Sequence, residues 1–295
     1  MSDGDVEQGN VWLASYPKSG NTWFRFIWSE LIGDGDAMAV TDSDTGSPSP
    51  AHSPQPCHTT PFANLMALDA RRLTADEIDI VRARVELVGH DRLGPPQLRK
   101  THERYRLSPD GEPLFPARAT RAAIVIVRDP RDVACSWSNH FGKSVQEAVD
   151  DVCSADVVWA GNAAAGMGRQ VLGSWSEHLD SWRRCDEFPV HVIKYEDMLD
   201  DACLVTYPVV AAVGLDVTRP QVAQAVEATA FDRLRSMEHD EGFVERVRRS
   251  SGPFFRRGQA GGWQEELTAE QVHKIERHHG ALMCEMGYEL QDPTS

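Results

Sequence analysis

The 295-residue chain has no apolar run near the roughly 18 residues that a membrane-spanning helix needs. Its longest apolar runs, AAIVIV and VVAAVGL, are far shorter. The first ten residues, MSDGDVEQGN, are polar and acidic and lack the basic and apolar regions of a secretory signal. We therefore expect a cytoplasmic protein with no stable membrane insertion.

Cysteine and positive charge are also scarce. The six cysteines are scattered without a CxxC pair, so neither a metal site nor a disulfide framework is indicated. The chain has 30 Lys and Arg residues and 45 Asp and Glu residues, which gives a net charge of −15. This surface disfavours binding to nucleic acid, so an anionic ligand has to be held by a local basic cluster.

Predicted strands alternate with predicted helices. Apolar, partly β-branched runs predict strands at 11–15, 122–127 and 190–195. Apolar residues that recur every three to four positions predict helices at 22–32, 73–88, 174–184, 219–230 and 268–286. This alternation predicts an α/β fold, a single domain over 1–295 whose central, mainly parallel sheet is flanked by helices. We expect 1–10 to be disordered and 41–61, with five prolines, to be a long loop.

Two helix starts are marked by capping residues. Thr74 with Glu77 has the spacing of a capping box. Asp129 is placed to cap a helix that has Pro130 at its first position, and Asp132 is expected to close a second capping box. Trp23, Ile27 and Leu31 are expected to form the buried stripe of the first helix.

The segment YPKSGNTW, residues 16–23, joins a strand to a helix and is called here the phosphate loop. Its small residues offer hydroxyls and backbone N–H groups at a helix N-terminus, and Lys18 adds a full charge. The lysine precedes the glycine, so the loop is not the GxxxxGK[ST] motif of magnesium-dependent nucleotide triphosphatases. A plain turn that uses Gly20 is the alternative.

A second anion site is indicated at Arg128, which ends the strand 122–127, with Ser136 in the following helix. The alternative is that Arg128 pairs with a neighbouring aspartate. In RKTHERY, Lys100 and His102 lie two residues apart and offer a cation and a base, although most histidines have no catalytic role.

A fourth signal is FFRRGQAGGW, where two arginines lead into glycines. Together with the preceding residues, 242–262 is predicted to be a mobile basic clamp. A surface loop with two solvated arginines is the alternative.

Taken in order, these segments resemble the PAPS-dependent sulfotransferases from about residue 11 to 288, which implies their P-loop-like nucleotide-binding fold. These enzymes move a sulfuryl group from 3′-phosphoadenosine 5′-phosphosulfate (PAPS) to a hydroxyl, leaving 3′,5′-diphosphoadenosine (PAP). By resemblance, the residues that implement catalysis are His102 as the general base, Lys18 at the bridging oxygen, Lys100 and Ser136. The resemblance assigns nucleotide binding to Lys18, Ser19, Gly20, Asn21, Thr22, Trp23, Arg128, Ser136, Tyr195, Thr229, Phe231, Arg256, Arg257 and Gly258. It implies that residues 19–23 hold the 5′-phosphate, that the 3′-phosphate is held by Arg128, Ser136, Arg256, Arg257 and Gly258, and that the adenine is contacted by Thr229 and Phe231. It also implies a hydrogen bond from Ser136 to Lys18.

The resemblance implies no metal, and it places 41–61 near the site of a small or medium hydroxyl acceptor. Several positions depart from the family pattern. Asn21 replaces a threonine, Gly262 an aspartate, and Gln264 a lysine that begins a dimer motif in many animal members; later positions of that motif are also altered, at Ala269 and His273. The oligomeric state therefore stays open. Two alternative functions remain at this point, an ATP-dependent phosphotransferase on a related fold and a catalytically idle nucleotide-binding protein.

Overall fold

The structure is a computed structural model that describes residues 9–33, 60–90, 98–159, 167–243, 245–246 and 250–291. The predictions for 1–10 and for 41–61 fall almost wholly outside these residues. At residue 60 the second helix begins, α2 (Thr60–Met66).

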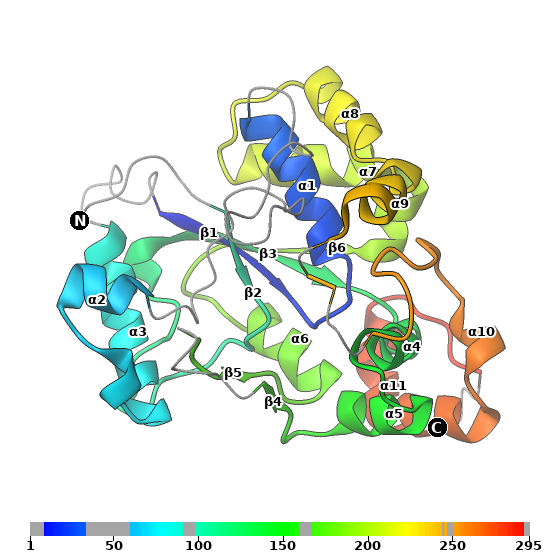
Figure 1. Cartoon of the computed structure of the whole chain (residues 1–295), viewed down its shortest axis with the longest axis horizontal. Coiled ribbons are helices and arrows are strands. Elements are labelled where there is room, and N and C mark those ends of the chain that lie inside the picture. The colour runs from blue at the N-terminus through cyan, green and yellow to red at the C-terminus, as the bar shows by residue number, and fades with distance from the viewer. Residues whose placement is uncertain are drawn as a thin grey trace. The chain divides into compact units, whose positions relative to one another are not determined.

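Four strands form the central sheet, in the order β2-β1-β3-β6 (Figure 1). Their bounds are β1 (Asn10–Ser15), β2 (Leu98–Thr101), β3 (Thr120–Val127) and β6 (Val190–Lys194). β1 pairs in parallel with β2 and with β3. Every residue of β1 is buried, as expected for a strand covered on both faces. The predicted α/β class with a mainly parallel sheet is confirmed.

The described residues group into two compact units. The first unit takes its residues from 1–16, 52–126 and 155–192, and the second from 17–51, 127–154 and 193–295. The chain passes from the first to the second unit directly after β1, and again at the last residue of β3.

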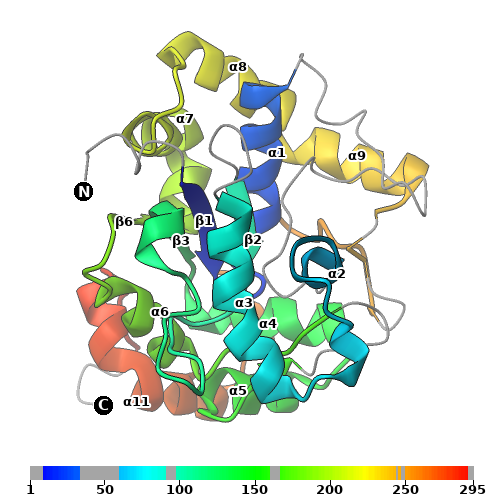
Figure 2. The same ribbon diagram turned by 90° about the vertical axis from the view of Figure 1, so that its left-hand side faces the viewer.

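The first unit contains most of the sheet and three α-helices among the described residues. These are α2, α3 (Ala75–His90) and α6 (Trp175–Arg183), with the short strands β4 (Val158–Trp159) and β5 (Gln170–Val171). α2 lies beside α3 (Figure 2) and packs on it through Phe62, Ile78 and Val85. The predicted capping box of α3 is confirmed, since Glu77 accepts from the Thr74 N–H at 2.8 Å and Thr74 Oγ1 from the Glu77 N–H at 3.3 Å.

Two buried carboxylates of the first unit share buried arginines. Asp79 and Glu103 have no exposed side-chain surface, and the Arg82 side chain is 1% exposed. Arg82 Nη1 lies 2.8 Å from Glu103 and 3.2 Å from Asp79. Arg106 reaches both carboxylates, at 2.7 and 2.9 Å. This network joins α3 to the segment that follows β2.

The second unit is helical over the described residues. Its α-helices are α1 (Asn21–Ile32), α4 (Pro130–Phe141), α5 (Val145–Cys153), α7 (Tyr195–Ala212), α8 (Arg219–Ala228), α9 (Phe231–Glu241), α10 (Trp263–Glu266) and α11 (Ala269–Glu285). α1 and α7 pack on α8, and α5 packs on α4 and α11. Of these helices, α5, α7, α9 and α10 were not predicted from the sequence. None of the described helices has both the length and the apolarity needed to cross a membrane.

Two local predictions are wrong. Asp129 does cap α4 and accepts from the Arg131 N–H at 2.8 Å, but Asp132 closes no capping box. Its carboxylate accepts instead from the N–H groups of Gly261 and Trp263, at 2.7 and 2.9 Å. Asp132 therefore bonds to backbone groups that are far away in the sequence instead of to the start of its own helix. A local sequence pattern contains no information about such distant partners.

The set of buried residues predicted for α1 is too small. Trp23 and Leu31 are only partly buried, whereas Phe24, Phe26 and Trp28 are buried. The helix is thus covered over most of its surface.

Candidate active site

The phosphate loop adopts a backbone conformation that most residues avoid. Lys18 has a φ of 71° and Gly20 a φ of 99°, both in the left-handed region. This region costs a residue with a side chain about 1–2 kcal/mol, which the surrounding packing has to offset. α1 begins at Asn21 with Gly20 as its N-cap, and no side chain caps its first N–H groups. The loop therefore presents a helix N-terminus suited to an anion.

The ring of Tyr195, at the start of α7, supports this loop. A Cβ atom on Gly20 would lie 2.4 Å from Tyr195 Cδ2, so the close approach requires glycine. Tyr195 is 8% exposed, and burial raises the pKa of its phenol. The structure thus places Tyr195 beneath the loop as a packing partner; its predicted contact with a nucleotide stays a prediction.

Two hydrogen-bond donors of the loop are buried without a hydrogen-bond partner among the described residues. They are Ser19 Oγ and Trp23 Nε1. A buried hydroxyl or indole N–H left unsatisfied costs about 1–3 kcal/mol, and such groups are rare unless a ligand or water completes them. Both are hydrogen-bond donors, so the loop suits a ligand rich in acceptors, such as a phosphate.

Arg128 lies against the same loop. Its Nη1 donates to the backbone oxygen of Lys18 at 3.1 Å, and its Nη2 donates to that of Gln259 at 3.1 Å. The guanidinium carbon lies 4.6 Å from the centroid of the Tyr195 ring. The two predicted anion sites are therefore adjacent in the second unit. Arg131 makes a buried pair with Asp129, at 2.7 Å.

The Lys18 ammonium lies over the ring of Phe254, with Nζ 3.7 Å from the centroid. Such a cation–π contact holds the charge without neutralising it. Ser136 lies in α4 and is partly exposed. Its predicted hydrogen bond to Lys18 stays a prediction.

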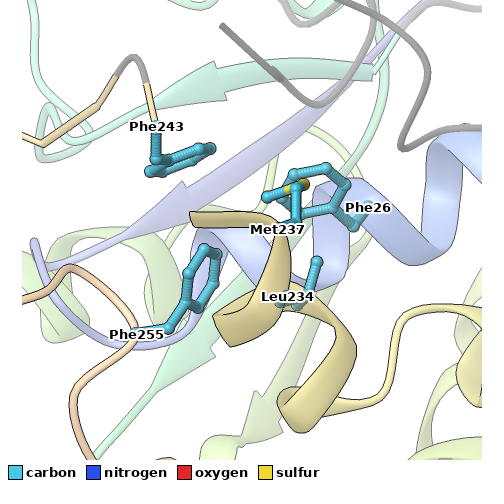
Figure 3. Close-up of a cluster of buried hydrophobic side chains, with 5 residues drawn as sticks. All are labelled: Phe26, Leu234, Met237, Phe243 and Phe255. Carbon is cyan, nitrogen blue, oxygen red and sulfur yellow. The ribbon is translucent and has the colours of Figure 1, made fainter. Parts of the chain in front are cut away.

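An aromatic cluster joins the predicted nucleotide-binding rings. Figure 3 shows its buried centre, which consists of Phe26, Leu234, Met237, Phe243 and Phe255. Trp23, Phe231 and Phe254 pack against this centre and are only partly buried. The fold therefore brings Trp23 of the phosphate loop to the same cluster as Phe231 of α9.

Gly258 packs on the predicted adenine-binding ring. A Cβ atom on it would lie 2.4 Å from Phe231 Cδ2, and its φ of 60° also favours glycine. Thr229 has another role in this structure. It is fully buried, and its hydroxyl donates to the Ala225 oxygen at 2.8 Å at the end of α8.

The two arginines of the predicted clamp are paired with carboxylates of α10. Arg256 makes two hydrogen bonds to Glu266, at 2.8 and 2.9 Å. Arg257 lies 3.2 Å from Glu265. Their contact with a 3′-phosphate stays a prediction, and it requires these ion pairs to exchange.

In the first unit, His102 follows β2 and is held at three points. Its Nδ1 lies 2.9 Å from the Ser15 backbone oxygen and 3.3 Å from Ser15 Oγ. Its backbone N–H donates to Gln170 Oε1 at 3.1 Å. A carbonyl only accepts, so Nδ1 carries the proton and Nε2 carries the lone pair. This is the tautomer that a general base on Nε2 requires.

Two further aromatic groups surround this histidine. The Trp159 ring meets that of His102 edge to face, with centroids 5.2 Å apart. His178 is fully buried, contacts the backbone of His102, and burial lowers its pKa to about 3, so it is neutral at neutral pH. Lys100 lies on β2 and is 7% exposed.

Sequence reasoning did not identify Ser15 and Gln170 as partners of His102. Ser15 is separated from it by 87 residues and Gln170 by 68. Neither residue belongs to a recognisable pattern. Only strand pairing in parallel, which brings the end of β1 beside the end of β2, could have suggested Ser15.

Comparison with known proteins gives one consistent result. The family model described as "Sulfotransferase domain" matches residues 8–287. An amine sulfotransferase of Oryctolagus cuniculus is 21% identical, over 94% of this chain and 81% of its own length. A flavonol 3-sulfotransferase of Flaveria bidentis is 24% identical, over 91% of this chain and 80% of its own length.

Solved structures show the same fold. The mouse sulfotransferase SULT7A1 complexed with PAP aligns with a TM-score of 0.57 at 20% identity, over 96% of this chain and 91% of the other. A retinol dehydratase in complex with androsterone and inactive cofactor PAP aligns with a TM-score of 0.59 at 17% identity, over 100% and 85%. At these identities the likeness shows the fold, and function has to be argued from the residues.

Proposed function

Because this chain belongs to the sulfotransferase family, as the match over residues 8–287 shows, we propose that it transfers the sulfuryl group of PAPS to a hydroxyl of a small or medium acceptor. Sulfuryl transfer in general follows from the family. The donor, the roles of single residues and the independence from metal are the parts proposed here.

The observation that carries the proposal is the contact between Arg128 and the phosphate loop. PAPS has charged groups at both its 5′ and 3′ positions, so its binding needs two cationic groups close together. Arg128 Nη1 touches the backbone of Lys18, and the Lys18 ammonium lies over the ring of Phe254. The unpartnered Ser19 hydroxyl and Trp23 indole N–H supply further donors. A magnesium–triphosphate ligand would call for the GK[ST] motif, which is missing from the loop.

In the proposed reaction, His102 Nε2 takes the proton of the acceptor hydroxyl while its oxygen forms a bond to sulfur. The bond from sulfur to the bridging oxygen of the 5′-phosphosulfate breaks, and PAP leaves with the electron pair. Lys18 neutralises the charge that develops on this oxygen, and Lys100 stabilises the sulfuryl oxygens. Ser136 orients Lys18 before the acceptor arrives.

The proposal is tested by incubating the purified chain with sulfur-labelled PAPS and a library of hydroxyl compounds, with product detection by mass. We expect an acceptor to gain one sulfuryl group, PAP to form in equal amount, and a chelator to leave the rate unchanged. ATP turnover that requires magnesium, without transfer from PAPS, would instead establish a phosphotransferase. Tight PAP binding without transfer to any acceptor would establish an idle nucleotide-binding protein.

Replacing Arg128 by alanine is expected to weaken PAP binding by about 1.5–3 kcal/mol, which is roughly 10- to 150-fold, because a charge-assisted hydrogen bond to the 3′-phosphate is lost. Calorimetric titration of both proteins with PAP measures the change. The matched ligand is adenosine 5′-monophosphate, which differs from PAP only in lacking the 3′-phosphate. An equal loss of affinity for both ligands would show that Arg128 only supports the loop through Lys18 and Gln259.

A further inference from the structure

Thr22, in the phosphate loop, holds a carboxylate from a distant part of the chain. Its Oγ1 lies 2.8 Å from Oε2 of Glu245, 223 residues away in sequence. The other carboxylate oxygen of Glu245 accepts from Arg25 Nη2 at 2.6 Å. Arg25 Nη2 also donates to Thr22 Oγ1, at 3.3 Å. The three side chains form a closed triangle beside the first turn of α1.

The Arg25 guanidinium in this triangle is buried, so its charge needs an anion beside it. The side chain of Arg25 is 4% exposed and that of Glu245 is 21% exposed, while Thr22 is 7% exposed. A guanidinium so far from water is stable only beside an anion or a set of acceptors. Glu245 supplies that anion, and its partial exposure leaves it a route back to water.

The hydroxyl of Thr22 cannot serve two acceptors. It has one proton, which goes to Glu245, because a carboxylate at neutral pH only accepts. A phosphate oxygen that takes the same hydrogen bond has to replace Glu245. Two anions at this distance from one hydroxyl would also repel each other. Glu245 and a phosphate at Thr22 therefore exclude one another.

We infer that Glu245 is an internal competitor of the donor nucleotide: its carboxylate occupies the position of a 5′-phosphate oxygen at Thr22 and leaves when the nucleotide binds. This inference rests on the proposed function. Once Glu245 has left, the buried charge of Arg25 stabilises the phosphate in its place. Glu245 thus lowers the affinity for both PAPS and PAP.

Two arginines that precede α10 are also paired with carboxylates of the protein. Arg256 and Arg257, both predicted to bind the 3′-phosphate, are neutralised by Glu266 and Glu265. With a net charge of −15, the protein has more acidic than basic side chains, so carboxylates are available to pair with these arginines. Thr22, Arg256 and Arg257, three of the residues predicted to bind the nucleotide, thus hold carboxylates of the protein itself.

The test compares Glu245→Gln with Glu241→Gln by calorimetric titration with PAP. Glutamine keeps the shape of the side chain and removes its charge. Glu241 ends α9 and is exposed, so its replacement changes the net charge equally without touching Thr22. We expect Glu245→Gln to bind PAP about tenfold more tightly than the parent, the scale of one charge-assisted hydrogen bond, and Glu241→Gln to bind it like the parent.

Adenosine 3′-monophosphate, which has no 5′-phosphate, separates local competition from general electrostatics. The gain in Glu245→Gln should vanish with this ligand. Because the variant leaves Arg25 without its anion, we also expect a lower melting temperature of the free protein and a larger rise on adding PAP. A Glu245→Gln protein that binds PAP equally or more weakly overturns the inference, since Glu245 would then only support the loop. If neither parent nor variant binds PAP, the proposed function fails first and the inference fails with it.

Discussion

Replacing His102 by alanine is expected to lower the rate of transfer by about 10²- to 10⁴-fold, because the attacking hydroxyl loses the base that takes its proton. The ring is placed for this role by the Ser15 backbone oxygen, which fixes the proton on Nδ1 and leaves Nε2 as the acceptor. Single-turnover transfer from labelled PAPS measures the loss. Affinity for PAP should stay within about twofold, since nucleotide binding is assigned to other residues.

The control is His239→Ala, whose side chain is 88% exposed and pairs only with the neighbouring Asp240 among the contacts described. It should transfer at the parent rate. If His102→Ala kept near-normal turnover, His102 would have no part in proton transfer. A loss of PAP affinity as large as the loss of rate would instead point to a collapse of the surrounding structure.

Replacing Arg82 by alanine is expected to lower the free energy of unfolding by about 3–5 kcal/mol, the cost of removing one partner from a buried ion pair, although Arg106 still contacts both carboxylates. Glu103 and Asp79 would keep their burial and lose a partner at 2.8 and 3.2 Å. For a protein whose total stability is typically about 5–15 kcal/mol, this is a large share. Urea unfolding followed by tryptophan fluorescence measures it.

A matched control lies two residues further along the same helix. Arg84 pairs with Asp110, but its side chain is 56% exposed. Alanine at this position should change the free energy of unfolding by no more than about 1 kcal/mol, as is usual for surface pairs. If the two variants were equally stable, Arg106 would suffice for both carboxylates, together with Arg169, which lies 2.6 Å from Asp79, and Arg82 would be dispensable.

The elements with strong local signals were predicted well. β1, β3 and β6 were each predicted to within about two residues, because their apolar and β-branched runs are hard to place anywhere but in a buried sheet. The caps at Thr74 and Asp129 were correct because they act within three residues of the helix start. Helices α5, α7, α9 and α10 were missed.

For the candidate site, the sequence alone determined which kinds of side chain and backbone group are present and that they suit an anion. Lys18, Gly20 and Arg128 stand in short motifs whose residue types already indicate an anion, and local geometry suffices for that inference. The sequence also determined the α/β class, because alternating strands and helices leave few other ways to bury their apolar faces.

Only the tertiary structure decided which groups meet. Tyr195 beneath Gly20, Ser15 at His102, Asp132 at Gly261 and Glu245 at Thr22 are contacts between residues far apart in the chain. The physical reason is that a hydrogen bond or a close packing contact depends on positions within a few tenths of an ångström. These positions are set by the packing of whole helices and strands, and no local stretch of sequence contains that information.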